Sequence, residues 1–336
     1  MKFGLRLPTY LFPEGAATLD TLNAFARRAE ELGFDSLWVV DHYLVARPSY
    51  RVAFMDPLQV LAAVASSSGS MRLGTSVLQL PLRNPVLLAK ELATLDWLTN
   101  GRVEFGVGNG WQQTEFDGIG VKLTERGRRT DEYLEIMTRL WTEGEVSFKG
   151  EYFQFEGVEI FPKPVQKPYP RISFGGGSTV KEVFADDRTF VKSERKLDRV
   201  FRRIGRYGVG WQATSVSDPE LLAQDWEQIA AFAREYGRDP NEIERMQTSY
   251  VVLDPDVEVA RRAYGRIVGK DFDEFLTKSS YLFGSGETIV EELHKRAELG
   301  IDRMILTPVD TDVSQLDRWA TEILEPFHKL PVAPRA

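Results

Sequence analysis

Asp41 and His42 stand side by side directly after a short apolar run, residues 36–40, and they carry the clearest chemistry in the sequence. The chain has three histidines, and the other two, His294 and His328, lie in an amphipathic helical pattern and near the C-terminus. An imidazole exchanges protons close to neutral pH, and a neighbouring charge tunes its pKa. The pair therefore predicts acid–base chemistry at His42, with Asp41 either assisting it or capping the segment that follows.

Two glycine-rich stretches also follow apolar runs. They consist of Gly106, Gly108, Asn109 and Gly110 in the first case, and of Gly175, Gly176, Gly177 and Ser178 in the second. Because glycine has no Cβ, both stretches allow a planar or phosphorylated ligand close to the backbone, and N–H groups before a helix bind anions. The alternative for each stretch is a plain tight turn. The first has the spacing G-x-G-x-G and therefore lacks the G-x-G-x-x-G of a dinucleotide-binding turn.

Several other classes of site find no support in the sequence. It contains no paired-histidine metal motif, no G-x-S-x-G serine nucleophile and no phosphate-binding loop of the G-x-x-x-x-G-K type. The absence of cysteine removes thiolate nucleophiles and iron–sulfur clusters, and the net charge of −8 argues against nucleic-acid binding. No apolar run reaches membrane-spanning length, and the N-terminus lacks a signal-peptide pattern. We therefore expect a cytoplasmic protein with no metal, membrane or nucleic-acid partner.

Short β-like runs alternate with longer helical patterns along the 336 residues. The candidate strands are residues 2–8, 36–40, 72–80, 102–108, 171–176, 207–213, 246–253 and 303–308. The helical patterns cover residues 19–33, 57–69, 85–101, 218–236, 257–268 and 287–300. Strands that alternate with helices form a parallel sheet, and eight such units predict one closed (β/α)8 TIM barrel, a single α/β domain over residues 1–336. The alternative is a doubly wound open sheet with a second domain.

Two segments interrupt this alternation. Residues 144–168 alternate aromatic and polar side chains and end in prolines, which predicts a β-excursion before the fifth strand. Residues 178–206 are long and charged, and we expect an insertion of about residues 179–199 between the fifth and sixth strands. Basic side chains dominate the second half of this segment. It therefore either contacts an anionic ligand or forms a solvated helix whose apolar face packs inward.

In a (β/α)8 barrel the residues that follow the strands meet at the carboxyl-terminal face. This face would bring Asp41 and His42 together with both glycine stretches and with the residues that end the third strand, Thr75, Ser76 and Val77. We also expect an apolar substrate pocket there, and the alternative for each of its aromatic side chains is a plain core position. The aromatic candidates are Phe12, Tyr43, Trp111 and Trp211.

The segments FDSLWVVDH, RLGTSVLQLPLRNPVLLAKELATLD, GRVEFGVGNGWQQTEFDGIG and ELGIDRMILTPV, in this order, resemble the bacterial luciferase-like monooxygenase superfamily. They are especially similar to its branch that uses FMN or the deazaflavin F420. The resemblance covers nearly the whole chain except residues 179–199. It implies a (β/α)8 barrel with an excursion before the fifth strand and a reduced cofactor bound across the carboxyl-terminal face.

The resemblance also assigns roles to individual residues. It implies cofactor contacts from Asp41, from residues 75–77 and from both glycine stretches, with a non-prolyl cis peptide at Ser76–Val77 and a phosphate-binding turn at 175–178. Asp41 and His42 match the proposed acid–base pair of F420-dependent sugar-phosphate dehydrogenases. Trp111 stands where those enzymes have a glutamate, and Ala46 where they have a tryptophan, so oxidation of a sugar phosphate is not implied.

The implied activity is that of an oxidoreductase acting on a small organic substrate. With F420, hydride would pass between cofactor and substrate while His42 exchanges the matching proton; with FMN, reduced flavin from a separate reductase would react with O2 to oxygenate the substrate. The Asp41 and His42 pair and residues 75–77 favour F420 slightly. We also expect a homo-oligomer. The alternative is a catalytically inert protein that binds flavin or F420 on the same barrel.

Overall fold

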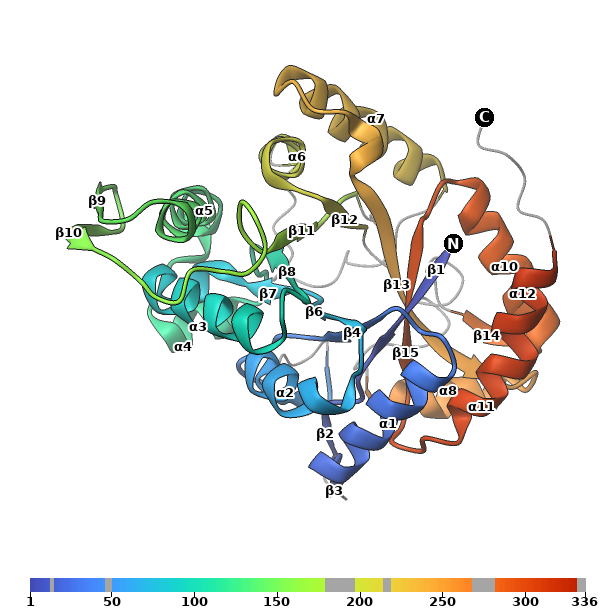
Figure 1. Cartoon of the computed structure of the whole chain (residues 1–336). Helices are drawn as coiled ribbons and strands as arrows, with labels where there is room; N and C mark the ends of the chain where they lie inside the picture. Colours follow the sequence, from blue (N-terminus) through green and yellow to red (C-terminus); the bar gives the residue numbers. More distant parts are fainter. Residues whose placement is uncertain (13–14, 46–49, 179–196, 214–218, 268–281, 331–336) are drawn as a thin grey trace.

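Eight parallel strands close into a barrel in the computed structural model, which describes residues 1–12, 15–45, 50–178, 197–213, 219–267 and 282–330 (Figure 1). In spatial order they are β1 (Lys2–Arg6), β4 (Ser36–Val39), β6 (Arg72–Thr75), β8 (Val103–Gly108), β11 (Arg171–Gly175), β12 (Gly210–Ala213), β13 (Glu244–Leu253) and β15 (Arg303–Pro308). Strand β15 pairs with β1, with Lys2 opposite Arg303, and closes the sheet. The predicted closed barrel is confirmed, and the open doubly wound sheet is wrong.

Helices connect the strands and surround the barrel in Figure 1. They are α1 (Leu19–Glu31), α2 (Pro57–Val64), α3 (Pro85–Leu98), α4 (Gln113–Ile119), α5 (Arg126–Thr142), α6 (Leu197–Tyr207), α7 (Pro219–Glu235), α8 (Val257–Gly265), α10 (Gly286–Glu298), α11 (Gln315–Trp319) and α12 (Glu325–Lys329). Their starts follow local chemistry: the Asn84 side chain accepts hydrogen bonds from the first-turn N–H groups of α3, and Pro85 occupies its first position. Gly33, at φ +82°, turns the chain from α1 into β4.

Shorter strands lie outside the eight-stranded circuit. They are β2 (Tyr10–Phe12), β3 (Gly15–Ala16), β5 (Ala53–Phe54), β7 (Leu78–Gln79), β9 (Val146–Lys149), β10 (Gln154–Val158) and β14 (Leu282–Gly284). Strands β9 and β10 form an antiparallel pair that projects from the barrel at the left of Figure 1. This pair confirms the predicted β-excursion before the fifth barrel strand.

The charged segment after β11 is described only from Leu197 onward, so residues 179–196 of the expected insertion lie outside the described residues. The described part is helix α6, whose Phe201 and Ile204 are buried in the core. Arg203 points into the protein, where it ion-pairs with Asp131 and donates to the Gly127 carbonyl. The inward packing of Phe201 and Ile204 agrees with the predicted helix whose apolar face packs inward, whereas Arg203 is buried and not on a solvated face.

The barrel interior is stacked in layers because inward-facing side chains alternate along each strand. Trp38 fills the middle layer together with Met246 and Ile305. Glycine is required beside it: a Cβ at Gly4 would lie 2.6 Å from Trp38 Nε1, and one at Gly74 would lie 2.3 Å from Trp38 Cε3. The outward faces of the strands pack against the helices and form the main hydrophobic core. Trp38 thus separates the amino-terminal end of the interior from the carboxyl-terminal end.

Candidate active site

The carboxyl-terminal end of the barrel places His42 against a carboxylate. His42 Nδ1 lies 3.1 Å from Glu115 Oε2, and both side chains are buried. Glu115, in the first turn of α4, also accepts hydrogen bonds from Gln79 Nε2 (3.1 Å) and from the Tyr43 backbone N–H (2.6 Å). Since His42 Nδ1 is held by Glu115, the ring orientation is fixed, and Nε2 makes no hydrogen bond to any residue in the described ranges.

The environment of Glu115 keeps it ionised. Burial acts to raise the pKa of Glu115, but the hydrogen bond and charge of His42 and the Gln79 hydrogen bond outweigh it, so the pKa lies below its ordinary value. An ionised carboxylate accepts a hydrogen bond from Nδ1–H, which fixes the tautomer and makes Nε2 the ring nitrogen available to a substrate. The pair is therefore built for proton transfer at Nε2.

Asp41, the sequence neighbour of His42, has different partners. Its carboxylate accepts hydrogen bonds from the Gln79 backbone N–H (2.8 Å) and from Arg83 Nη2 (3.0 Å). Burial raises the pKa of Asp41, although the Arg83 guanidinium opposes that shift. Gln79 also donates to the Asp41 carbonyl (3.2 Å) as well as to Glu115, so one glutamine ties both acids together. Asp41 thereby fixes the loop that carries His42.

The peptide bond Ser76–Val77 is cis, as the resemblance implies. The glycines of the neighbouring strands make room for this segment: a Cβ at Gly106 would lie 1.8 Å from the Thr75 carbonyl oxygen, and a Cβ at Gly108 or Gly175 would lie 2.6 or 2.8 Å from Val77 Cγ2. Thr75 donates its hydroxyl to the Gly106 carbonyl (2.7 Å). These glycines therefore have a packing role within the chain, in addition to any ligand contact.

The remaining residues of the first glycine stretch are also held by the protein. Gly110 has φ +72° and lies against Gln79 and Phe116, where a Cβ would come within 2.6 Å of Gln79 Oε1. Asn109 Oδ1 accepts hydrogen bonds from Thr130 (2.9 Å) and Arg203 (3.2 Å). This stretch is a rigid connection between β8 and α4, and it sets the position of Glu115.

The second glycine stretch meets an internal carboxylate. Ser178 donates both its backbone N–H and its hydroxyl to Asp225 of helix α7, each at 2.6 Å. Trp211 Nε1 donates to the Gly176 carbonyl (2.7 Å), and Gly177 has φ +148°. Burial raises the pKa of Asp225, while the hydrogen bonds from Ser178 oppose the shift. An anion at this turn would either displace Asp225 from Ser178 or bind to other donors.

Polar side chains form the last inward layer of the barrel above Trp38. Ser76 lies 3.5 Å from Thr248, and Gln212 Nε2 donates to the Thr75 carbonyl (3.2 Å) and to Ser173 (3.0 Å). Some buried polar atoms of this end of the barrel have no hydrogen-bond partner among the described residues. They are Arg6 Nε, Thr9 Oγ1, Gln212 Oε1 and Thr307 Oγ1. Buried polar atoms are normally satisfied, so this layer has free hydrogen-bonding capacity for a ligand.

The aromatic residues expected in a substrate pocket do not all lie together. Trp111 meets His42 edge-on at a ring distance of 5.9 Å, and Phe12 packs with Tyr10 at 5.6 Å. Tyr43 packs against the separate cluster of Leu82, Phe116 and Leu123, under the Arg83 guanidinium. Trp211 lies elsewhere: it faces outward from β12 into the helix–strand core and stacks with Trp226. Ala46 lies outside the described residues.

Tyr50 and Phe54 complete the surroundings of His42, with ring distances of 5.0 and 5.5 Å. Sequence reasoning did not single out these rings, nor Glu115, Gln79, Arg83 and Arg6. One available signal for Glu115 was its place in the first helical turn after the glycine stretch, since a buried acid there needs a partner. For Trp211 the available signal was strand alternation: Gly210 and Gln212 on either side of it face the interior, so the Trp211 side chain points outward to the helices.

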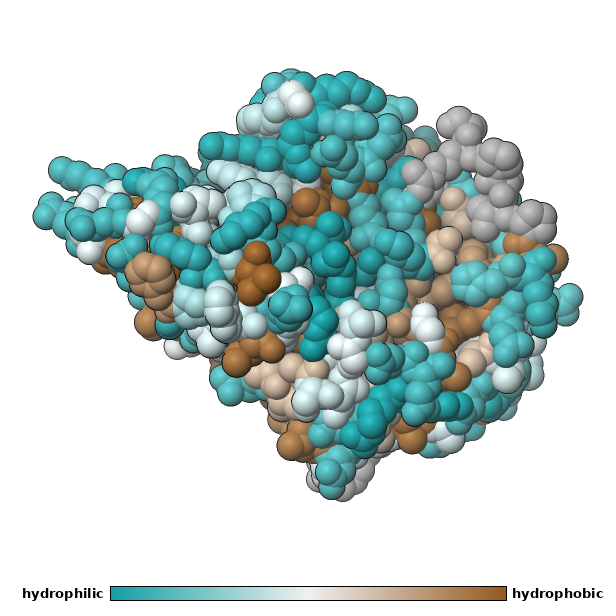
Figure 2. Space-filling model, viewed as in Figure 1, coloured by the Kyte–Doolittle hydropathy of each residue, from teal (hydrophilic) through white to brown (hydrophobic). Residues whose placement is uncertain are grey.

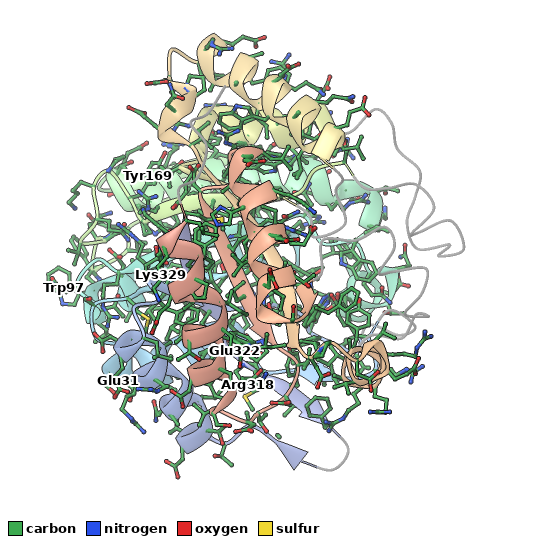
Figure 3. All side chains as sticks on the ribbon, turned by 90° about the vertical axis from the view of Figure 1, so that its right-hand side faces the viewer. Glu31, Trp97, Tyr169, Arg318, Glu322 and Lys329 are labelled. Carbon is green, nitrogen blue, oxygen red and sulfur yellow. The ribbon has the colours of Figure 1, made fainter. Side chains whose placement is uncertain are left out.

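A surface hollow among the described residues lies apart from this site. It has a volume of about 740 Å³ and is lined by Trp97, Asn100, Phe161, Pro162, Lys163, Pro164, Val165 and Lys167. Trp97 lies at the edge of the molecule in Figure 3. The face shown in Figure 2 is mostly hydrophilic, with small apolar patches scattered over it. Within the described residues, no group of three potential metal ligands lies together, and no helix is long and apolar enough to cross a membrane.

Comparison with known proteins relates this geometry to a family. The family model described as luciferase-like monooxygenase matches residues 1–274. A curated relative, the F420-dependent glucose-6-phosphate dehydrogenase of Amycolatopsis mediterranei, is 38% identical over 165 residues, which cover 46% of this chain and 47% of the relative. The matched segment therefore spans about half the length of that relative.

Two solved structures share the fold over nearly the whole chain. One is an F420-dependent secondary alcohol dehydrogenase in complex with an F420–acetone adduct, with a TM-score of 0.77, 21% identity and 97% of each chain covered. The other is the monooxygenase RslO1 from Streptomyces bottropensis, with a TM-score of 0.78, 24% identity, and 97% of this chain and 100% of that chain covered. At these identities the likeness establishes the fold.

Proposed function

The chain belongs to the luciferase-like monooxygenase family, and we propose that it is an oxidoreductase that uses reduced F420 or FMN on a small organic substrate at the carboxyl-terminal end of its barrel. One observation carries the proposal: Glu115 holds His42 Nδ1 at 3.1 Å and leaves Nε2 without a partner among the described residues. A fixed imidazole beside a layer of unsatisfied polar atoms suits proton transfer to a bound substrate. The named relatives include F420-dependent dehydrogenases and a monooxygenase, which supports this class of reaction.

The residues at this end of the barrel suit a flat, polar-edged cofactor. The unsatisfied Gln212 carbonyl and Thr307 hydroxyl offer an acceptor and a donor, and neither has a partner among the described residues. Val77, after the cis peptide, presents an apolar side chain against Gly108 and Gly175. We infer that Asp41, residues 75–77 and the two glycine stretches hold the cofactor, as the family resemblance implies. At the proposed phosphate position, residues 175–178, a phosphate would compete with Asp225, because the Asp225 carboxylate already accepts hydrogen bonds from the Ser178 N–H and hydroxyl.

The chain's own residues have separable tasks in this reaction. When bound, a reduced deazaflavin supplies a hydride, and a reduced flavin supplies electrons for O2 chemistry. His42 Nε2 gives a proton to, or takes one from, the substrate oxygen, while Glu115 stabilises the protonated ring. Asp41 and Arg83 hold the loop that carries His42. The aromatic rings of Tyr50, Phe54 and Trp111 limit the access of water to His42.

A binding titration tests the proposal directly. The purified protein is titrated with FMN and F420, each oxidised and reduced, while absorbance and fluorescence are followed, with NADPH as a control ligand. We expect saturable binding of F420 or FMN, tighter for the reduced form, and none of NADPH, because the chain lacks the dinucleotide-binding spacing. Binding of neither F420 nor FMN overturns the proposed function.

A further inference from the structure

Arg6 is the cation of the polar layer above Trp38. It ends β1 and faces inward, two residues after Gly4, whose missing side chain makes room for Trp38. Arg6 Nη2 donates to the Ser76 hydroxyl (3.0 Å) and to the Ser76 carbonyl (3.3 Å). Its buried Nε has no hydrogen-bond partner among the described residues. The guanidinium therefore lies beside the cis peptide with part of its hydrogen-bonding capacity unused.

The positive charge of Arg6 is not matched within the described ranges, where no carboxylate lies within ion-pair distance of it. The acids at this end of the barrel are engaged elsewhere. Glu115 is bound to His42, and Asp310 accepts hydrogen bonds from the Asp312 backbone (2.9 Å) and Gln315 (2.7 Å). Partly buried cations are normally paired, so an Arg6 charge that no carboxylate of the described residues meets is suited to an anionic ligand.

Two tyrosines connect Arg6 to the aromatic rings around His42. Tyr10 follows Arg6 four positions later in the chain and donates its hydroxyl to the Pro308 carbonyl (2.8 Å) at the end of β15, the strand beside β1. Burial raises the pKa of Tyr10 and of Tyr50, and the Arg6 charge opposes both shifts. Tyr50 also lies 5.0 Å from the His42 ring, and Tyr10 lies 5.8 Å from Phe54. The cation and the proton-transfer residue thus border the same set of aromatic rings.

Building on the proposed function, we propose that Arg6 binds the carboxylate of an aromatic substrate and so presents the substrate's reacting group to His42. A planar carboxylate accepts hydrogen bonds from a guanidinium in a fixed geometry, which sets the orientation of the substrate. The half-buried rings of Phe12 and Tyr50, which pack on the buried Tyr10 and Phe54, provide flat apolar contacts for the body of such a molecule. Arg6 is accordingly a specificity-determining residue of this chain.

The test measures binding without turnover and uses benzoate and its neutral isostere benzamide as probes. Titration calorimetry on the wild-type protein at low salt should give about tenfold or greater preference for benzoate, as expected for a charge-assisted pair. The Arg6→Met variant should lose this preference, and Arg6→Lys should keep part of it. The matched control is Arg266→Met, which removes the cation over the Phe12 ring and should leave the preference unchanged.

Two outcomes overturn the inference. One is a wild-type protein without preference for benzoate over benzamide, and the other is an Arg6→Met variant that keeps the preference while its thermal unfolding matches the wild type. If Arg6→Met instead weakens the binding of reduced cofactor and leaves the benzoate preference intact, Arg6 serves the cofactor and the inference is wrong. The cofactor titration that tests the proposed function does not use these probes. A failure of the proposed function can therefore be told apart from a failure of the inference about Arg6.

Discussion

At the amino-terminal end of the barrel, Arg303 ion-pairs with Glu244 at 3.0 Å and with Asp35 at 3.1 Å, and it donates to Ser36 (2.8 Å). At the carboxyl-terminal end, Arg6 donates to the hydroxyl and carbonyl of Ser76 and pairs with no carboxylate in the described part of the chain. Both arginines face the interior of the same barrel, on either side of Trp38. At both ends the chain pairs charges, as Arg303 does below Trp38 and Arg83 does with Asp41 above it. Arg6 differs from these arginines because no carboxylate of the described residues pairs with it, which suits it to an anionic ligand.

The largest effect should come from removing the proton-transfer group at the carboxyl-terminal end. His42→Asn keeps a side chain that can hydrogen-bond to Glu115 but cannot exchange protons at neutral pH. We expect turnover with the reduced cofactor to fall by about 10²- to 10⁴-fold, while cofactor binding persists. Steady-state kinetics and the binding titration measure the two quantities. The control is His328→Asn, near the C-terminus, and equal turnover in both variants would show that His42 has no acid–base role.

A stability effect of somewhat smaller size should come from the other end. Arg303→Met leaves Asp35 and Glu244 without their shared cation, and we expect the free energy of unfolding to fall by about 2–4 kcal/mol. Asp35 is partly exposed, and Lys2 and Arg171 remain near Glu244, so the loss should stay below that of a fully buried pair. Denaturant titration measures the change.

The control for Arg303 is an ion pair on the surface. Arg318 and Glu322, labelled in Figure 3, pair at 2.9 Å on exposed helical turns. Arg318→Met should change the free energy of unfolding by no more than about 0.5 kcal/mol. Similar losses in the Arg303 and Arg318 variants would remove the distinction between matched interior charges and surface charges.

Glu115→Gln should reduce turnover by about 10- to 100-fold, which is less than the loss expected for the His42 variant. The reason is that His42 keeps its proton-transfer group but loses the negative charge beside its ring. The pH dependence of stability should change as well. The folded pKa of Glu115 lies below its ordinary value of 4.5. Its contribution to stability is therefore present above pH 4.5 and is lost as the pH falls through the lower folded pKa. The free energy of unfolding, measured at several pH values across this acid range, should depend less on pH for Glu115→Gln than for the wild type.

The smallest effect concerns Asp225. Its folded pKa is raised by burial, so its ionised form costs stability at neutral pH, and the cost disappears as the pH falls below the folded value. Asp225→Asn removes the charge, leaves one oxygen to accept from the Ser178 N–H and lets the amide NH2 donate to the Ser178 hydroxyl. We expect phosphate-bearing cofactor to bind up to about fivefold more tightly. Calorimetry measures the affinity, with Glu235→Gln on the same helix as the control. Weaker binding in Asp225→Asn would place the phosphate away from residues 175–178.

The barrel was predictable because strand and helix periods alternate cleanly and because caps such as Asn84 and Gly33 mark the helix ends. The partner of His42 was not, since Glu115 lies 73 positions away and meets His42 only through the fold. Asp41 was the natural candidate from sequence, yet its carboxylate points to Arg83 and the Gln79 backbone. Adjacent residues diverge in this way because successive side chains leave the backbone in different directions.

The same limit applies to the glycine stretches. Their missing side chains indicated close approach, but the sequence alone did not distinguish approach by a ligand from approach by Val77 or Thr75 of the next strand. Arg6 was overlooked because a single arginine at the end of a strand has no distinctive spacing. Only closure of the barrel brings it beside Ser76.

Trp38 has a consequence for how such an enzyme can diversify. A fully buried indole, with glycines at positions 4 and 74 pressed against it, forms a solid partition across the barrel. Substitutions in the layer above it do not touch the ion pairs below, and the two sets of mutational effects should add. Substitutions that change substrate preference can therefore accumulate at the carboxyl-terminal end without reducing the stability that the ion pairs at the amino-terminal end provide.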